Sequence, residues 1–249
     1  MYKRLWVLMV LVLLLFAMTR CSRQYESDKD AEYSGSVSAQ KIVEIGESAG
    51  NEDSESEVPG ERPQDDWRLI LVNPWNPIPD NYQVELVRLD NKQSADKRCY
   101  TELINMLDDC RKAGLFPIIC SSYRTRERQQ YLYDRQVERL VRRGYSREEA
   151  EKEAATSNAV PGTSEHQTGL AFDIVDRNNQ NLDESQEDTP VQKWLMENSW
   201  RYGFILRYPE DKSEITGIIY EPWHYRYVGK EAAKEIYERK ICLEEFLQS

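Results

Sequence analysis

Residues 164–176, Ser-Glu-His-Gln-Thr-Gly-Leu-Ala-Phe-Asp-Ile-Val-Asp, decide the fold and carry its most unusual chemistry. Residues 169–175 form a short, mainly apolar run, which is typical of a strand buried in a sheet. Asp173 lies inside this run and needs a partner, either a metal ion or an arginine, because a lone buried carboxylate is costly. His166 lies just before the strand, and a bend at the glycine can bring it to the same metal ion as Asp173. Asp176 is the competing acid, but it lies on the opposite face of a regular strand.

The chain of 249 residues has only two histidines, and the second lies in the segment Glu-Pro-Trp-His at 221–224. A catalytic zinc takes three protein ligands and keeps one position open for water. With two histidines available, we expect the third ligand to be a carboxylate, so that His166, Asp173 and His224 hold one Zn²⁺ ion. Glu221 can then sit beside the open position, take a proton from water and pass it to a leaving amine.

An arginine is placed where it can assist this chemistry. The segment Ser-Ser-Tyr-Arg at 121–124 follows an apolar run at 115–120 that predicts a strand, and functional sites usually lie at strand ends. The guanidinium of Arg124 can stabilise the oxyanion of a tetrahedral intermediate or hold a substrate carboxylate.

The remaining sequence predicts one α+β domain over residues 67–249. Gly114 and Gly144 follow helical patterns as stop signals. Apolar runs and helical spacing predict strands at 69–72, 115–120, 169–175, 204–208 and 216–220, and helices at 95–113, 125–143, 188–201 and 232–247. Because strands and helices do not alternate regularly, we expect a single compact domain with a small antiparallel sheet flanked by helices, and not a doubly wound sheet.

The first 66 residues differ in character from the rest. Residues 1–21 contain Lys3, Arg4 and then an apolar run to Met18. Such a run spans about 21 Å as a helix, which suits an export signal or signal anchor better than an ordinary membrane span. Cleavage, lipidation at Cys21 and an uncleaved anchor remain alternatives, and each exports the rest of the chain. Residues 22–66 hold 13 acidic and 4 basic side chains and predict a disordered linker.

Composition excludes several classes of protein. The net charge of −11 argues against a nucleic-acid-binding protein, since that function needs a basic face. Two histidines exclude a three-histidine zinc site, and their spacing excludes the helical His-Glu-x-x-His motif. Ser-x-x-Lys occurs at 38–41 and 94–97, but no Lys-Thr-Gly triad accompanies it, so a serine-type carboxypeptidase is not indicated.

The two histidine segments also form a paired motif. Ser-x-His-x-x-Gly-x-Ala-x-Asp runs from Ser164 to Asp173, and Glu-x-x-His runs from Glu221 to His224. This pair resembles the VanY-type zinc D-alanyl-D-alanine carboxypeptidases. Further stretches similar to the family lie at 71–73, 122–125, 161–166, 203–209, 221–229 and 243–246. The resemblance covers essentially all of residues 67–249.

The resemblance implies specific roles. It implies one zinc ion and a catalytic acid and base at the residues already selected, namely His166, Asp173, His224 and Glu221. It also implies that Arg124 lies near the scissile carbonyl, and that Ser164 and Gln129 help to bind the terminal residue of the substrate. The implied fold is the family's zinc-peptidase domain.

The resemblance also implies a substrate. The expected activity is removal of the C-terminal D-alanine from peptidoglycan stem peptides. The N-terminal segment itself predicts that the enzyme is held on the outer face of the cytoplasmic membrane, and we expect a monomer. Some members of the family are instead L,D-carboxypeptidases that act on tetrapeptide stems, which is the first alternative. The second is a cell-wall-binding zinc domain without catalysis, which the intact Glu221 argues against.

Overall fold

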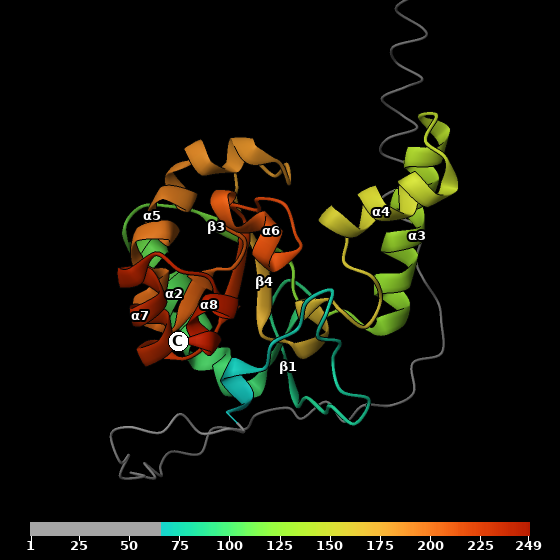
Figure 1. The fold of residues 1–249 in the computed structure, drawn as a ribbon. Coiled ribbons are helices and arrows are strands. Elements are labelled where there is room, and N and C mark those ends of the chain that lie inside the picture. Colours follow the sequence, from blue (N-terminus) through green and yellow to red (C-terminus); the bar gives the residue numbers. More distant parts are fainter. Residues whose placement is uncertain (1–65) are drawn as a thin grey trace, which may run out of the picture. The chain divides into compact units, whose positions relative to one another are not determined.

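A four-stranded antiparallel sheet lies at the centre of the part of the chain that the computed structural model describes, residues 66–249 (Figure 1). Its strands are β3 (Pro117–Ser121), β4 (Ala171–Asp176), β5 (Phe204–Leu206) and β6 (His224–Tyr227), in the order β3-β4-β6-β5. A separate antiparallel pair is formed by β1 (Leu86–Arg88) and β2 (Ser94–Asp96). The expected α+β class with small antiparallel sheets flanked by helices is confirmed.

The two faces of the sheet differ in chemistry because side chains alternate along each strand. Phe172 and Ile174 on β4 and Tyr225 on β6 point to one face, where they belong to the main hydrophobic core. Asp173 and His224, which alternate with them, therefore point to the other face. The sheet thus has one apolar face for stability and one polar face for chemistry.

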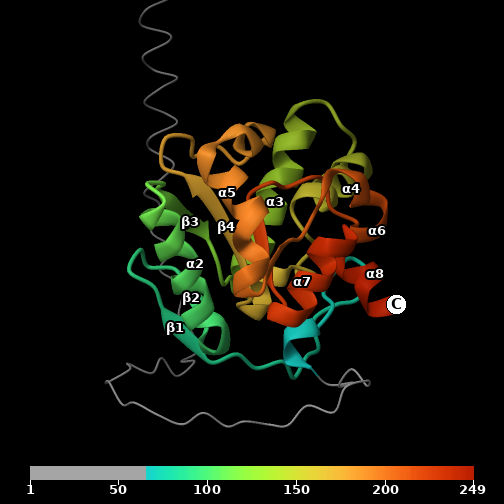
Figure 2. The same ribbon diagram turned by 90° about the vertical axis from the view of Figure 1, so that its left-hand side faces the viewer.

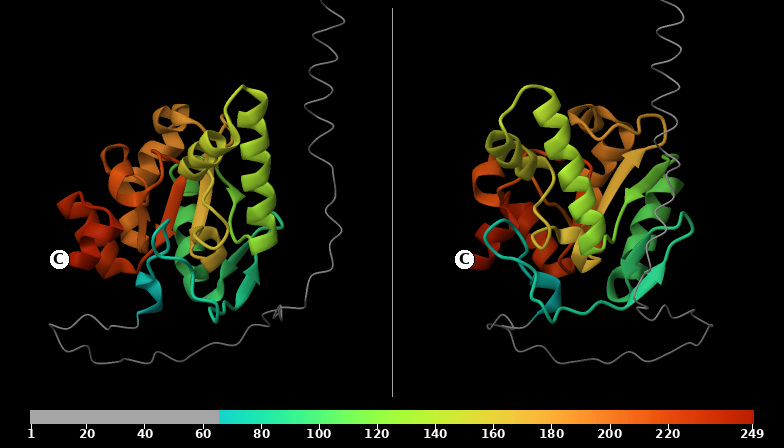
Figure 3. Two further views of the ribbon diagram at one scale, coloured as in Figure 1. Left: turned by 45° about the vertical axis from the view of Figure 1, so that its right-hand side comes forward. Right: turned by 90° about the vertical axis from the view of Figure 1, so that its right-hand side faces the viewer.

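Helices cover the sheet on both sides. They are α2 (Tyr100–Lys112), α3 (Arg126–Arg142), α4 (Arg147–Ser157), α5 (Pro190–Asn198), α6 (Ser213–Thr216), α7 (Lys230–Arg239) and α8 (Leu243–Gln248). Apolar side chains of α2 and α5 complete the main core. The antiparallel pair α3 and α4 has its own small core of Val137, Leu140, Ala150 and Ala154, and it lies across the sheet from α5 and α7 (Figures 1 and 3).

The predicted strand at 69–72 is wrong. Residues Trp67–Leu69 form a 3₁₀ helix, and Leu71 follows it in extended chain outside any sheet. Leu69 and Leu71 pack against the core that α7 and α8 form with β5, and the first described residues accordingly lie beside those helices (Figure 2). The apolar run therefore packs onto the hydrophobic cores without joining a sheet.

Three other predicted elements need correction. The predicted strand at 216–220 is wrong, because Thr216 ends α6 and Gly217 then adopts a left-handed φ of +77° that stops regular structure. The single helix expected at 232–247 is divided into α7 and α8 at Lys240, which has a φ of +54°. The helix expected at 95–113 begins only at Tyr100, since β2 occupies its first residues.

The export segment and almost all of the linker predicted for residues 1–66 lie outside the described residues. Asp66 is described, and its side chain accepts a hydrogen bond from the backbone N–H of Arg68 at the start of the first 3₁₀ helix. Within residues 66–249, no helix is both long and apolar enough to cross a membrane. The predictions about the N-terminal segment therefore stay predictions.

Candidate metal centre

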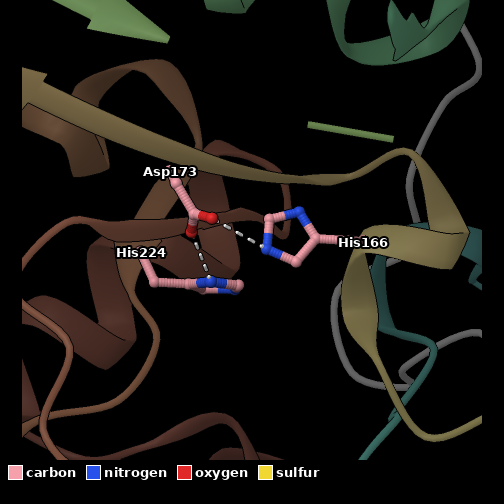
Figure 4. Close-up of side chains that lie close together, drawn as sticks. All are labelled: His166, Asp173 and His224. Carbon is pink, nitrogen blue, oxygen red and sulfur yellow. Dashed lines mark hydrogen bonds and ion pairs between the residues drawn. The ribbon is translucent and has the colours of Figure 1, made fainter. Parts of the chain in front are cut away.

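His166, Asp173 and His224 converge on one point of the polar face of the sheet (Figure 4). One ligand atom from each lies within 4.8 Å of the others, and all three side chains are buried. His166 Nε2 lies 3.3 Å from Asp173 Oδ2, and His224 Nδ1 lies 3.0 Å from Asp173 Oδ1. Asp173 thus stands between two imidazoles, with one carboxylate oxygen toward each. The competing acid, Asp176, is not part of this cluster.

Sheet register brings two of these residues together. Asp173 on β4 is paired directly with His224 on β6, so their side chains leave the same face as cross-strand neighbours. A slip of one residue would turn one of them into the apolar core. The pair therefore depends on the alternation of apolar and polar residues along both strands.

A left-handed glycine brings the third residue into place. His166 lies in the 3₁₀ helix Glu165–Thr168, which ends at Gly169 with a φ of +76°. A Cβ atom at this glycine would lie 3.0 Å from the backbone nitrogen of Asp96, so a larger residue meets both strain and backbone. The bend expected at Gly169 is present and turns the chain from His166 into β4.

The ring of His166 is held in one orientation. Its Nδ1 lies 2.8 Å from the carbonyl oxygen of Ser122, so Nδ1–H donates there and Nε2 is left with a lone pair that faces Asp173. Burial and the nearby guanidinium of Arg124 lower the pKa of His166 to about 4. His166 is therefore neutral at physiological pH, as a metal ligand must be.

The charges around Asp173 suit a cation. Burial alone would raise the pKa of Asp173, but the histidines beside it hold that pKa well below its usual range. Burial lowers the pKa of His224, but the neighbouring carboxylates of Asp173 and Glu165 outweigh it and raise the pKa to about 9. Two imidazole nitrogens and one carboxylate are a donor set that zinc accepts, so these residues fit the ion, and its binding displaces the proton that His224 otherwise carries.

Glu221 lies beside this cluster at the end of a turn. The backbone N–H of His224 donates to the carbonyl oxygen of Glu221 at 3.1 Å, and the turn carries both side chains to the same side. Glu221 Oε2 lies 3.6 Å from His224 Nδ1. Burial raises the pKa of Glu221 to about 8, an effect that the proton-bearing His224 partly offsets. A carboxyl group with this pKa can both accept and donate a proton near neutral pH.

Arg124 contacts the cluster directly. Its Nη2 donates to Asp173 Oδ2 at 3.0 Å, and its Nη1 donates to Gln129 Oε1 at 2.9 Å. Gln129 is fully buried, and its Nε2 donates to the carbonyl oxygen of Ala159 at 2.7 Å. The structure thus places Gln129 behind Arg124, where both ends of its amide are engaged. The predicted contact of Gln129 with substrate stays a prediction.

A cleft of about 430 Å³ leads from the cluster to the surface. Ser164, His166, Asp173, Glu221 and His224 lie at its base together with Arg124. Its walls extend well beyond these residues, over one face of α3, the end of α4 and an apolar rim, and include Gln136, Arg139, Arg143, Glu153, Leu182 and Ile219. The cleft is therefore lined by charged side chains of both signs as well as by apolar ones.

A buried charge network beside His224 was not foreseen from the residues. Glu165 Oε1 accepts hydrogen bonds from Arg207 Nε at 2.8 Å and from Arg226 Nη1 at 2.7 Å. Arg207 also donates to both carboxylate oxygens of Glu244 in α8, at 2.9 and 2.7 Å. Arginines inside apolar strand-like segments were the available signal, since a buried charge needs a partner.

The sequence of this chain is similar to a known protein family and to known enzymes. Residues 92–230 match the family model VanY, D-alanyl-D-alanine carboxypeptidase. The chain is 50% identical over 186 residues to a D-alanyl-D-alanine carboxypeptidase of Enterococcus faecalis, covering 75% of this chain and 68% of that protein.

Two solved structures are similar to this one. A variant of the vancomycin resistance D,D-pentapeptidase VanY from a VanB-type cassette, in complex with Zn(II), has a TM-score of 0.68 and 49% identity, covering 73% of this chain and 99% of that one. The LD-carboxypeptidase LdcB has a TM-score of 0.63 and 39% identity, covering 72% and 84%. The chain is therefore a carboxypeptidase that belongs to the VanY family of D-alanyl-D-alanine carboxypeptidases.

Proposed function

We propose that this chain removes the C-terminal D-alanine from peptides that end in D-alanyl-D-alanine, using one zinc ion held by His166, Asp173 and His224. The observation that carries the proposal is the convergence of these three buried ligands, with Glu221 Oε2 only 3.6 Å from a ligand nitrogen. The relative from Enterococcus faecalis is a D-alanyl-D-alanine carboxypeptidase, and the similar VanY structure contains Zn(II), which supports the same activity and ion here.

Zinc in such a site polarises a carbonyl group and lowers the pKa of water to about 7. The side chains supply the remaining steps. Glu221 takes the proton of the attacking water and passes it to the nitrogen of the departing D-alanine. The guanidinium of Arg124 faces the same space and stabilises the negative charge that develops on the carbonyl oxygen. Ser164 lines the cleft, which supports a contact with the terminal residue of the substrate.

The proposed substrates are peptidoglycan stem peptides, cleaved outside the cytoplasmic membrane by a monomer that residues 1–21 attach to its outer face. The cleft supports a peptide substrate, because its volume is about 430 Å³ and its lining runs from the metal cluster to α3 and the end of α4. The location rests on the apolar N-terminal segment and the acidic linker in the sequence. These substrates lie where an exported, tethered enzyme would meet them.

L,D-carboxypeptidase activity on tetrapeptide stems is the second candidate. The similarity to the LD-carboxypeptidase LdcB favours it, since that structure and this chain share 39% identity. The two activities differ in whether the residue before the cleaved bond has the D or the L configuration. The higher identity to a D-alanyl-D-alanine carboxypeptidase places the D,D activity first.

One assay tests both candidates. The full-length chain in mild detergent is incubated with synthetic pentapeptide and tetrapeptide stems, with and without a zinc chelator, and free D-alanine is measured. We expect release from the pentapeptide that the chelator abolishes and added zinc restores. Release that is insensitive to the chelator would exclude the zinc mechanism, and release from the tetrapeptide alone would assign the L,D activity.

The role of Glu221 has its own test. Removing a general acid and base typically lowers the rate about 10²–10⁴-fold. We expect the Glu221→Ala variant to lose activity to this extent while still binding zinc. A variant that binds zinc and keeps the full rate would show that Glu221 does not transfer the proton.

A further inference from the structure

Two buried polar atoms face each other without a hydrogen bond. Among residues 66–249, Glu165 Oε2 and His224 Nε2 are the buried side-chain atoms that lack a hydrogen-bond partner. They lie 3.7 Å apart, and each side chain is at most 3% exposed. Leaving a buried polar atom unpaired is costly, so the pair requires an explanation.

No water molecule fits between the two atoms. A bridging water needs about 2.8 Å to each partner, and a bent arrangement then separates the partners by about 4.5 Å. The observed 3.7 Å is shorter than this and about 0.5 Å longer than the upper end of a direct N–H···O hydrogen bond. A small shift of the imidazole therefore joins His224 Nε2–H to the carboxylate of Glu165.

Glu165 is fixed from its other side. Its second oxygen, Oε1, accepts from two guanidinium groups, those of Arg207 and Arg226, at 2.8 and 2.7 Å. Arg207 is held in turn by Glu244, and Arg226 Nη2 donates to the backbone carbonyl oxygen of Ile70 at 2.8 Å. The carboxylate plane of Glu165 cannot rotate without breaking these bonds, so Oε2 stays aimed at His224.

We propose that Glu165 is a positioning residue that selects the tautomer of His224. By accepting the proton on Nε2, it leaves the lone pair on Nδ1, the nitrogen that lies 3.0 Å from Asp173 Oδ1 and faces the metal centre. A histidine ligand commonly donates its other ring N–H to a carboxylate in this way. This inference rests on the proposed zinc site.

Glu165→Gln tests the proposal, because the amide reverses the hydrogen bond. The two guanidinium groups can only donate, so they keep the amide oxygen at the position of Oε1. The amide NH₂ then faces His224 Nε2 and favours the tautomer that has its proton on Nδ1. Zinc cannot use that nitrogen, and we expect the affinity for zinc to fall about 10–100-fold.

Glu244→Gln is the matched control. It removes the charge of the other buried carboxylate that binds Arg207, but Glu244 has no contact with His224. The full-length chain in mild detergent is titrated with zinc against a chromophoric chelator at pH 7, and melting temperatures are recorded for both variants. We expect Glu244→Gln to keep its zinc affinity within about threefold, even where its melting temperature falls as far as that of Glu165→Gln.

The unmodified protein gives an independent readout. The chain has only two histidines, so long-range proton–nitrogen spectra contain only two imidazole spin systems. In the zinc-loaded protein we expect the His224 proton on Nε2 and coordination through Nδ1. Three results would each overturn the positioning role. They are a proton on Nδ1 of His224, an equal zinc affinity of Glu165→Gln and the unmodified chain, and equal losses of zinc affinity in the two variants. Failure of the unmodified chain to bind zinc would instead overturn the proposed function.

Discussion

Asp173 is the side chain on which the other groups of the site depend. It contacts His166, His224 and Arg124, so its charge serves two imidazoles and a guanidinium at once. Its ionised state is secured without a metal, because the histidines hold its pKa well below the usual range. The carboxylate is thus ready to bind a cation at any pH near neutrality.

Replacing this carboxylate by an amide tests how much Asp173 contributes to zinc binding. In Asp173→Asn the charge is lost while the shape is retained, and Arg124 loses its ion pair. Replacing a residue that only supports a metal ligand typically lowers metal affinity about 10–100-fold. We expect the zinc affinity of Asp173→Asn to fall by more than this, because Asp173 is itself a ligand. Isothermal titration with zinc measures this, and an affinity close to that of the unmodified chain would remove Asp173 from the ligands.

Gln129 should act through Arg124. Its amide oxygen accepts from Arg124 Nη1 at 2.9 Å, and hydrogen bonds to charged groups contribute about 1.5–3 kcal/mol. We expect Gln129→Ala to lower kcat/KM about tenfold or more, with unchanged zinc affinity. Steady-state kinetics on a pentapeptide stem test this, with Gln136→Ala on the same helix as a control for loss of an amide from the cleft. Equal effects of the two substitutions would contradict the prediction.

At the scale of elements, β4 and β6 carry two residues of the metal centre, while α3 forms part of the wall of the cleft that leads to it. The face of α3 along the cleft carries Arg139, and Arg143 follows directly at the C-cap of α3; both are exposed and without a salt bridge to any residue in 66–249. A cationic wall at a distance from the metal centre suits a substrate with carboxylates upstream of the cleaved bond. Stem peptides have such groups, and the free dipeptide has only its terminal one.

Charge reversal on α3 should therefore depend on substrate length. We expect the double variant Arg139→Glu and Arg143→Glu to raise KM for a pentapeptide stem, with little change for D-alanyl-D-alanine. Arg142→Glu is the matched control, since it lies on α3 but does not line the cleft. The increase should shrink at high ionic strength. Equal changes in KM for both substrates would show that Arg139 and Arg143 do not contact the upstream part of the peptide.

Local patterns predicted the elements of the site better than the elements around it. The run 169–175 predicted β4 and the bend at Gly169, because a buried strand after a glycine has a clear local pattern. Strand β6 was not predicted, since His224 and Arg226 make its polar face resemble a loop. Their burial depends on partners distant in sequence, which a single local pattern cannot show. The tautomer of His224 is fixed by such a partner as well.

At the scale of the whole molecule, buried ion pairs join distant segments. Glu165 and Glu244 bind Arg207, while Arg226 reaches the backbone of residues 68 and 70. The site, the first described residues and α8 are therefore one unit. Breaking one partner of a buried pair typically costs about 3–5 kcal/mol, so these contacts are linked to global stability.

Acid should unfold this unit. Burial raises the pKa of both buried glutamates, but the arginines outweigh it and hold the pKa values below the usual 4.5. A carboxyl group with a depressed pKa in the folded state contributes stability above its unfolded pKa and loses it as the pH falls through its folded pKa. We expect the urea midpoint of the metal-free chain to fall below about pH 4.5. Urea titrations followed by circular dichroism at pH 3–6 measure this midpoint. We expect the midpoint of Glu244→Gln to fall less steeply with pH than that of the unmodified chain. Parallel declines of the two midpoints would argue against the network.

The order of the strands has a consequence for when the enzyme becomes active during its production. Asp173 becomes a cross-strand neighbour of His224 only after 51 further residues have been made. A chain still being synthesised therefore lacks the third of these residues until position 224 has been added. A site that uses all three side chains can therefore bind zinc only after β6 has been made and paired with β4.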